Sequence, residues 1–218
     1  MKGQMNGFFV TGTDTGVGKT VLSALLVAAL DAVYWKPVQT GATEGTDRES
    51  VRLWAEPPEE QLLPERYCFD PPVSPHLAAR EAGVRIALDA FEFPAAPADR
   101  TWIVEGAGGV MAPLNERDLM LDLMRRVGLP VVVAARTALG TINHTLLTLA
   151  ALHAAHLKIR GVVLIGAENL ENRRAIEHYG DIRVIGHIPV LERIHRAALL
   201  DVFSKNFDRA AFQPRLSI

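Results

Sequence analysis

The sequence predicts an α/β fold in which a mainly parallel, doubly wound sheet carries helices on both faces. Short apolar, β-branched runs alternate along the chain with longer segments of helical pattern, as in parallel strands joined by helical crossovers. The strand runs are almost continuously apolar, which is typical of a sheet buried on both faces. Because the 218 residues contain no linker-like or repeated segment, we expect a single domain over residues 1–218.

The expected elements follow from these patterns in chain order. Strands are predicted at FFVT (8–11), AVYW (32–35), WIV (102–104), PVVVAA (130–135), GVVLIG (161–166) and VIGHIP (184–189). Helices are predicted at TVLSALLVAAL (20–30), DRESVRLWA (47–55), LAAREAG (77–83), RDLMLDLMRRVG (117–128) and INHTLLTLAALHAAHL (142–157). The rest of the proline-rich segment from about 43 to 100 is expected to be irregular.

The composition indicates which kinds of partner and which compartment to expect. The net charge is −2, without the basic excess that nucleic-acid binders show. No apolar stretch approaches the roughly 20 residues of a membrane span, and the first residues lack a signal-peptide pattern. A single cysteine excludes an intrachain disulfide and fits a reducing compartment. We therefore expect a cytoplasmic protein with small-molecule ligands and neither a nucleic-acid nor a membrane partner.

The stretch GTDTGVGKT (12–20) indicates a phosphate-binding loop. The common pattern G-x-x-x-x-G-K-[ST] would place its first glycine at residue 13, which is Thr, so Gly12 comes one position early. A strand, a glycine-rich turn and a helix beginning at Lys-Thr still give the right context, because backbone N–H groups at a helix N-terminus attract phosphate. Lys19 would reach the β and γ oxygens, and the Thr20 hydroxyl would bind Mg²⁺. The polar residues 13–15 suggest a second ligand beside the γ-phosphate.

Further candidates follow two of the predicted strands. Lys36 in KPVQTG (36–41) is either a second cation of the site, with a pKa lowered by desolvation, or a surface lysine. Glu105 is expected to end its strand before a glycine-rich turn, where a carboxylate suits Mg²⁺. Asp47 is either a third metal ligand or the N-cap of the helix after it, and Glu49 is close enough to take its place.

These motifs together resemble the dethiobiotin synthetase family. The matching segments are FFVTGTDTGVGKT, KPVQTG, VSPHLAA, IVEGAGGVMAPL, LPVVVAARTALGTINHTLLTL and IGHIPVL, in family order over nearly the whole chain. The resemblance implies a P-loop NTPase-like fold and a homodimer with a Mg·ATP site in each subunit. It implies a cyclo-ligase that converts 7,8-diaminopelargonate, CO₂ and ATP to dethiobiotin, ADP and phosphate through a carbamate and a carbamic-phosphoric anhydride.

The resemblance also implies residue roles. Lys36 and Lys19 would be catalytic, with Thr20, Asp47 and Glu105 as metal ligands. The diamine would contact Thr15 and Thr40, and its carboxylate would bind near Thr141 and Asn143, across the dimer interface. The remaining implied contacts are with the nucleotide, from Gly16, Val17, Gly18, Val21, Pro189, Val190 and Leu191. Gly106, Ala107 and Gly108 would lie against the nucleotide or the carbamate.

One departure concerns the nucleobase. Many relatives carry an Asn-led pair that reads adenine where this chain has Ile165 and Gly166, so Glu168, Asn169 or backbone contacts would have to replace it. Two rival classes share the loop. A partition or nitrogenase-type switch ATPase usually carries a lysine early in the loop, where this chain has Thr13. A cobyrinate-type amidotransferase synthetase would need a glutaminase half, for which the chain has no room.

Overall fold

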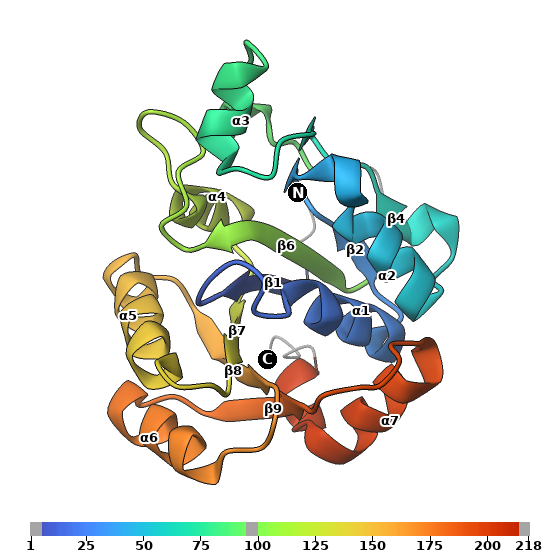
Figure 1. Ribbon diagram of the computed structural model, residues 1–218, viewed down its shortest axis with the longest axis vertical. Helices are drawn as coiled ribbons and strands as arrows, with labels where there is room; N and C mark the ends of the chain where they lie inside the picture. Colours follow the sequence, from blue (N-terminus) through green and yellow to red (C-terminus); the bar gives the residue numbers. More distant parts are fainter. Residues whose placement is uncertain (1–5, 95–99, 214–218) are drawn as a thin grey trace.

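The computed structural model describes residues 6–94 and 100–213, and its main element is a parallel sheet of seven strands (Figure 1). Their order across the sheet is β4-β2-β6-β1-β7-β8-β9. The strands are β1 (Gly7–Gly12), β2 (Val33–Trp35), β4 (Leu62–Leu63), β6 (Trp102–Gly109), β7 (Val131–Arg136), β8 (Ile159–Ile165) and β9 (Val184–Ile188). The predicted fold class is confirmed.

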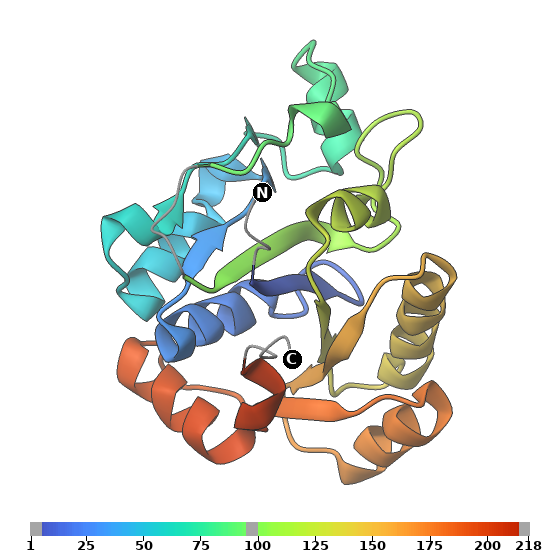
Figure 2. The same ribbon diagram turned by 180° about the vertical axis from the view of Figure 1, so that it is seen from behind.

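Helices cover both faces of this sheet (Figures 1 and 2). One face packs on α1, α2 and α7, and the other on α4, α5 and α6. The helices of the described residues are α1 (Lys19–Leu30), α2 (Asp47–Ala55), α3 (Pro75–Glu81), α4 (Met120–Val127), α5 (Thr141–Ala154), α6 (Leu170–Gly180) and α7 (Arg196–Asn206). The sequence analysis did not predict helices α6 and α7.

The strand sequences explain the two layers. Successive side chains of a strand point to opposite faces. In β1, Phe8 and Val10 therefore enter the core beneath α1, while Phe9 enters the core beneath α4 and α5. Apolar residues at every position of a central strand are thus needed to fill both layers.

Strand β6 is longer than predicted. The sequence predicted an end at residue 104 or 105, but the strand continues through the glycines to Gly109, which pairs with Gly12 of β1 after a shift in register. Glycine within a strand usually weakens it, but here the hydrogen bonds between β6 and β1 extend the strand through the glycines. Glu105 therefore lies within a strand and not at its end, and the prediction was wrong on this point.

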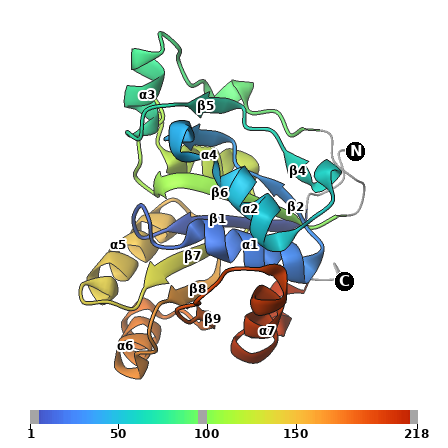
Figure 3. The same ribbon diagram turned by 45° about the vertical axis from the view of Figure 1, so that its right-hand side comes forward.

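The proline-rich segment folds beside β2, at the end of the sheet opposite β9, and supplies the edge strand β4 (Figure 3). It contains α2 and α3 where helices were predicted, and also β5 (Tyr67–Phe69), which pairs in parallel with β3 (Val38–Thr40) from the residues just before the segment. Residues 95–99 of this segment lie outside the described residues. Within the described ranges, none of the helices has the length and apolarity needed to cross a bilayer.

Candidate active site

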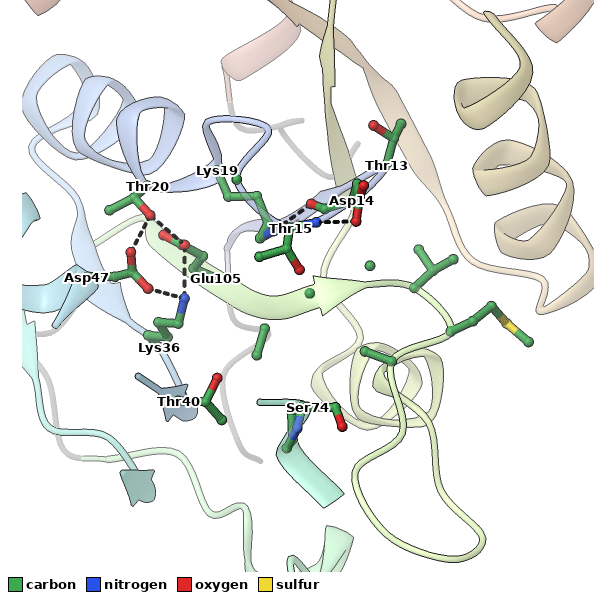
Figure 4. A pocket seen from close by; sticks show the side chains of 18 of the residues that line it. Thr13, Asp14, Thr15, Lys19, Thr20, Lys36, Thr40, Asp47, Ser74 and Glu105 are labelled. Atoms are coloured by element: carbon green, nitrogen blue, oxygen red, sulfur yellow. Dashed lines mark hydrogen bonds and ion pairs between the residues drawn. The ribbon is translucent and has the colours of Figure 1, made fainter. Parts of the chain in front are cut away.

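A pocket of about 830 Å³ opens at the carboxyl-terminal side of β1, β2 and β6 (Figure 4). Ligands of parallel α/β sheets commonly bind at this edge. The loop after β1 forms one wall, the residues that follow β2 and the glycines of β6 form another, and α5 contributes a third. The glycine-rich motif and both candidate lysines therefore meet in one cavity.

Close backbone approach shapes the loop between β1 and α1. A Cβ on Gly12 would lie 2.6 Å from Cγ2 of Val17 and 3.0 Å from the carbonyl oxygen of Asp14. Gly16 and Gly18 have φ values of 67° and 101°, in the left-handed region that favours glycine. The early glycine of the motif is thus required for the loop to fold back on itself, and it is not a displaced copy of the usual first glycine.

The N-terminus of α1 is left free to bind an anion. Its N-cap, Gly18, provides no side-chain cap, and no acidic residue lies in the first turn. Unpaired N–H groups and the positive end of the helix dipole suit a phosphate. Lys19 is buried, and its Nζ donates to the carbonyl oxygen of Asp14 at 3.0 Å. Burial lowers the pKa of Lys19 below its ordinary value, and the Glu105 carboxylate only partly offsets this.

Arg136, at the end of β7, supports the same loop from behind. Its guanidinium donates to the carbonyl oxygens of Thr15 at 3.3 Å and Gly16 at 3.0 Å. No motif in the sequence pointed to this arginine.

Four polar side chains from different elements converge beside the loop (Figure 4). Nζ of Lys36 contacts Oδ2 of Asp47 and lies 3.2 Å from Oε1 of Glu105. Oγ1 of Thr20 lies between the same carboxylates, in contact with Asp47 Oδ1 and 3.0 Å from Glu105 Oε1. Behind them, the hydroxyl of Tyr34 donates to Oε2 of Glu105 at 3.0 Å. Lys36 is therefore a member of the site and not a surface lysine.

Burial and charge oppose each other in this cluster. Burial alone would lower the pKa of Lys36, but attraction to Glu105 and Asp47 outweighs it and raises the pKa. The lowered pKa expected from the sequence was wrong, because that expectation considered burial without the two carboxylates. Burial alone would raise the pKa of Asp47, and Lys36 holds it below its ordinary value. Burial and the Glu105 charge raise the pKa of Tyr34 well above its ordinary value, so the hydroxyl keeps its proton.

The cap of α2 distinguishes the surroundings of Asp47 from those of Glu49. Thr46 is the N-cap and accepts a hydrogen bond from the backbone N–H of Glu49, whose carboxylate in return accepts from the N–H of Thr46. This capping box occupies Glu49 at an exposed position. Asp47 is thereby left free to point into the pocket, and its backbone N–H donates to Oε1 of Gln39 at 3.2 Å.

Thr20, Asp47 and Glu105 fit a magnesium ion in the chemistry of their donors. They offer one hydroxyl and two carboxylates, and Mg²⁺ prefers oxygen ligands and usually keeps several waters. Within residues 6–94 and 100–213, no group of three or more His, Cys, Asp and Glu side chains could hold a metal ion alone. A magnesium ion here would complete its shell with water and phosphate oxygens.

Most of the predicted residues line the pocket. They are Thr15, Gly16, Gly18, Lys19, Thr20, Val21, Lys36, Thr40, Asp47, Glu105, Ala107 and Gly108. The remaining predicted residues are not among those that line it, namely Val17, Gly106, Thr141, Asn143, Pro189, Val190 and Leu191. From α5, the lining residues are instead His144, Leu147, Thr148 and Ala151.

The structure adds residues that the sequence reasoning missed. Tyr34 on β2 donates to the Glu105 carboxylate, and Gln39 on β3 accepts from the backbone N–H of Asp47 and donates to the carbonyl oxygen of Thr40 at 2.7 Å. Gln39 lies inside the KPVQTG motif, so its place next to Lys36 was a usable signal. Tyr34 had no such signal, because a tyrosine in an apolar strand is typical of a packing residue.

The end of β8 packs against the phosphate loop through Ile165, one of the two residues that replace the Asn-led pair of many relatives. A Cβ on Gly18 would lie 2.8 Å from Cδ1 and 3.1 Å from Cγ2 of the Ile165 side chain. Asn169 is the N-cap of α6, where its side-chain oxygen accepts from the N–H of Asn172 at 2.9 Å. Since its oxygen already serves the helix, Asn169 is a poor substitute for an asparagine that reads a base.

The parallel sheet, the glycine-rich loop before an uncapped helix and the buried Lys19 in one pocket define a nucleotide-binding protein of the P-loop class. The chain matches the AAA domain family over residues 6–198. It is 50% identical over 195 residues to the ATP-dependent dethiobiotin synthetase BioD of Paramagnetospirillum magneticum. The aligned region covers 89% of this chain and 93% of that protein. The chain belongs to the dethiobiotin synthetase family, and the resemblance inferred from the motifs is confirmed.

Two further relatives carry the same name. The chain is 47% identical to the protein of the same name from Rhodopseudomonas palustris strain TIE-1, over 94% of each chain. The corresponding protein of Brucella melitensis biotype 2 is 44% identical over 91% of this chain and 92% of its own. Among solved structures, a ParA family ATPase from Chlorobium tepidum aligns with a TM-score of 0.49 and 14% identity, over 90% of each chain.

Proposed function

We propose that this protein is an ATP-dependent cyclo-ligase that converts 7,8-diaminopelargonate and CO₂ to dethiobiotin. The observation that carries the proposal, beside the family, is the pair of buried lysines, Lys19 and Lys36, in one pocket with the phosphate loop. Phosphate binding requires only the first of them. A second buried cation suits a second anion beside the γ-phosphate, as a carbamate would be.

The proposed reaction has three steps. One amine of the diamine adds to CO₂ and loses a proton, which gives a carbamate. A carbamate oxygen attacks the γ-phosphorus of ATP, and ADP leaves. The second amine then attacks the carbonyl carbon of the mixed anhydride and loses a proton, phosphate leaves with the C–O bond electrons, and a cyclic urea remains. Because two anions approach each other in the second step, its barrier depends on nearby positive charge.

The lysines supply this charge in our proposal. Lys19 bridges the β and γ oxygens, and Lys36 moves from its carboxylates to the carbamate. Thr15 and Thr40 line the same pocket and position the nitrogen-bearing end of the diamine by hydrogen bonds. The loop residues Gly16, Val17, Gly18, Thr20 and Val21 surround the phosphates, since a free helix N-terminus lies there.

Thr20, Asp47 and Glu105 would hold Mg²⁺, which when bound would neutralise charge on the phosphate oxygens. Their convergence at a single point of the pocket supports this assignment. Lys36 contacts two of these three residues, Asp47 and Glu105, so in this proposal one site would order both the phosphates and the carbamate.

The far end of the pocket suits the aliphatic chain of the substrate. Val110, Met111 and Leu147 line it there, and Met111 and Leu147 are exposed. We propose that the N-terminus of α5, with Thr141 and Asn143, receives the carboxylate of the substrate bound to a second copy of the chain. Exposed apolar residues near this terminus, including the fully exposed Leu139, support a homodimer.

The nucleoside part of ATP is assigned to the opposite side. Gly106, Ala107 and Gly108 follow Glu105. Ala107 and Gly108 line the pocket, where Gly108 allows close approach of a ligand, whereas Gly106 packs against Phe9 and Met120. The segment Pro189, Val190 and Leu191 follows β9, next to the Ile165 end of β8 that covers the loop. We propose that this segment lines the base pocket, and that residues 1–218 act as one catalytic domain in the cytoplasm, where ATP is available.

The test is a coupled measurement of phosphate release and product mass. Release of phosphate from ATP should require both the diamine and bicarbonate, and mass spectrometry should show the cyclic urea. ATP hydrolysis that proceeds equally without the diamine would refute the proposal and favour a switch ATPase. Light scattering during size-exclusion chromatography would test the dimer separately.

A further inference from the structure

Tyr34 is a fully buried tyrosine whose hydroxyl reaches the pocket from behind. Strand β2 pairs in parallel with β6, and Tyr34 lies opposite Ile103. Side chains two residues apart on a strand share a face, so Ile103 and Glu105 both point to the side of the sheet on which Tyr34 lies. The hydroxyl thereby reaches Oε2 of Glu105 at 3.0 Å.

This bond divides the two oxygens of Glu105 between two tasks. Oε2 accepts from Tyr34, within the core. Oε1 lies 3.0 Å from the Thr20 hydroxyl and 3.2 Å from Lys36 Nζ, on the side of the pocket. Since Glu105 is completely buried, water does not compete for Oε2. The carboxylate is held with one oxygen turned toward the other candidate metal ligands and the second oxygen turned away.

The number of oxygens that a carboxylate presents affects which cation it binds. Mg²⁺ demands a nearly ideal octahedron with short bonds, whereas the larger Ca²⁺ accepts six to eight ligands and readily takes both oxygens of one carboxylate. A carboxylate restricted to one oxygen therefore favours the smaller ion. Partners that fix a ligand in this way strongly influence metal affinity.

We propose that Tyr34 is a positioning residue that makes Glu105 a one-oxygen ligand and so makes the site select Mg²⁺ over Ca²⁺. The inference rests on the proposed metal site of Thr20, Asp47 and Glu105. It adds to that site a residue from β2 that does not itself contact the metal or the substrate.

Tyr34→Phe tests this with little change in volume. The variant and wild-type proteins, each with a non-hydrolysable ATP analogue, would be titrated with Mn²⁺ and followed by electron paramagnetic resonance, with Mg²⁺ and Ca²⁺ as competitors. We expect Mg²⁺ to compete roughly tenfold less effectively in the variant, with Ca²⁺ unchanged or more effective. The ratio of Mg²⁺ to Ca²⁺ affinity should therefore fall about tenfold.

Tyr67→Phe is the matched control. In the wild-type protein the Tyr67 hydroxyl also has one protein partner, because it accepts from the backbone N–H of Ala87 at 3.2 Å. Tyr67 is not among the residues that line the pocket. This variant should keep the wild-type ratio. An unchanged ratio in Tyr34→Phe, or equal weakening of both ions, would overturn the inference while leaving the metal site intact. Wild-type protein that binds no Mn²⁺ in the presence of the analogue would overturn the proposed metal site and this inference with it.

A second measurement needs no variant at position 34, in case Tyr34→Phe does not fold. The chain has three tyrosines, so protein labelled with ¹³C at the tyrosine ζ carbon should give three resonances. Tyr67→Phe and Tyr179→Phe assign them. Adding Mg²⁺ to wild-type protein saturated with the ATP analogue should shift the Tyr34 resonance, and Ca²⁺ should shift it differently. A Tyr34 resonance that responds to neither ion, or identically to both, would refute the proposal.

Discussion

Replacing Lys36 with glutamine removes the cation that contacts both Asp47 and Glu105. Breaking a buried ion pair on one side costs about 3–5 kcal/mol. The Asp47 side chain is 26% exposed, so water screens part of its charge, and we expect the lower end, about 3 kcal/mol. For a chain of this length that corresponds to a fall in Tm of about 6 to 12 °C. Mg²⁺ should restore part of the loss, because it supplies positive charge to the same carboxylates.

The same variant should lose turnover more than it loses nucleotide binding. Lys36 contacts the carboxylates and not the loop, so the phosphate-binding backbone remains intact. Loss of one group that stabilises developing negative charge typically costs about 10²–10³ in kcat. Phosphate release with saturating diamine and bicarbonate measures kcat, and equilibrium binding of a fluorescent ATP analogue measures affinity. Lys158→Gln, at an exposed lysine, is the control. A Lys36→Gln kcat within about threefold of wild type would refute the role assigned to Lys36.

Four further predictions address the rest of the site. Asp47→Asn should raise the Mg²⁺ concentration required for turnover, whereas Glu49→Gln should leave it nearly unchanged, and equal effects in activity titrations would contradict the cap assignment. The pKa of Asp47 is lowered from 3.8 in the folded state, so its contribution to stability is complete above pH 3.8 and is lost as the pH falls through the lowered pKa. The difference in Tm between wild type and Asp47→Asn should therefore shrink in acid. A difference in Tm that stays constant would contradict the pairing of Asp47 with Lys36. Gly12→Ala should weaken ATP binding by about tenfold or more, because a Cβ at this position would collide with the loop backbone. A wild-type ATP affinity for this variant in calorimetric titration would contradict the role assigned to Gly12. With Ile165 at the base side and Asn169 occupied as a cap, other nucleoside triphosphates should compete well with ATP, and strong selection of ATP in competition assays would disprove it.

The sequence was most informative where chemistry and backbone geometry coincide. The loop and the alternation of strands and helices were predictable, because each depends on a local pattern. For Lys36 the sequence left a second cation of the site and a surface lysine as alternatives, because its place depends on contacts with Asp47 and Glu105. Helix α6 was missed since its sequence is largely polar and only Ile176 is buried, so no apolar periodicity marks it. The end of β6 was misplaced because pairing with β1, which is remote in sequence, carries the strand through its glycines.

The site itself shows the same division. Asp47 and Glu49 are indistinguishable in the sequence as candidate acids, and only the capping box of Thr46 separates them. The raised pKa of Lys36 depends on two carboxylates that are 11 and 69 residues away along the chain. Both properties arise from contacts that the fold creates and that no local pattern contains.

Asp47 is the candidate metal ligand carried by α2, whereas Thr20 lies at the start of α1 and Glu105 lies on β6. Thr20 and Glu105 are anchored by α1 and β6, but the position of Asp47 depends on how α2 packs against α1 through Val51 and Ala55. Substitutions at that interface, far from any substrate, would move one carboxylate relative to the other. The α1–α2 interface is therefore a place where laboratory evolution could adjust the metal requirement of the enzyme without altering a residue that lines the pocket.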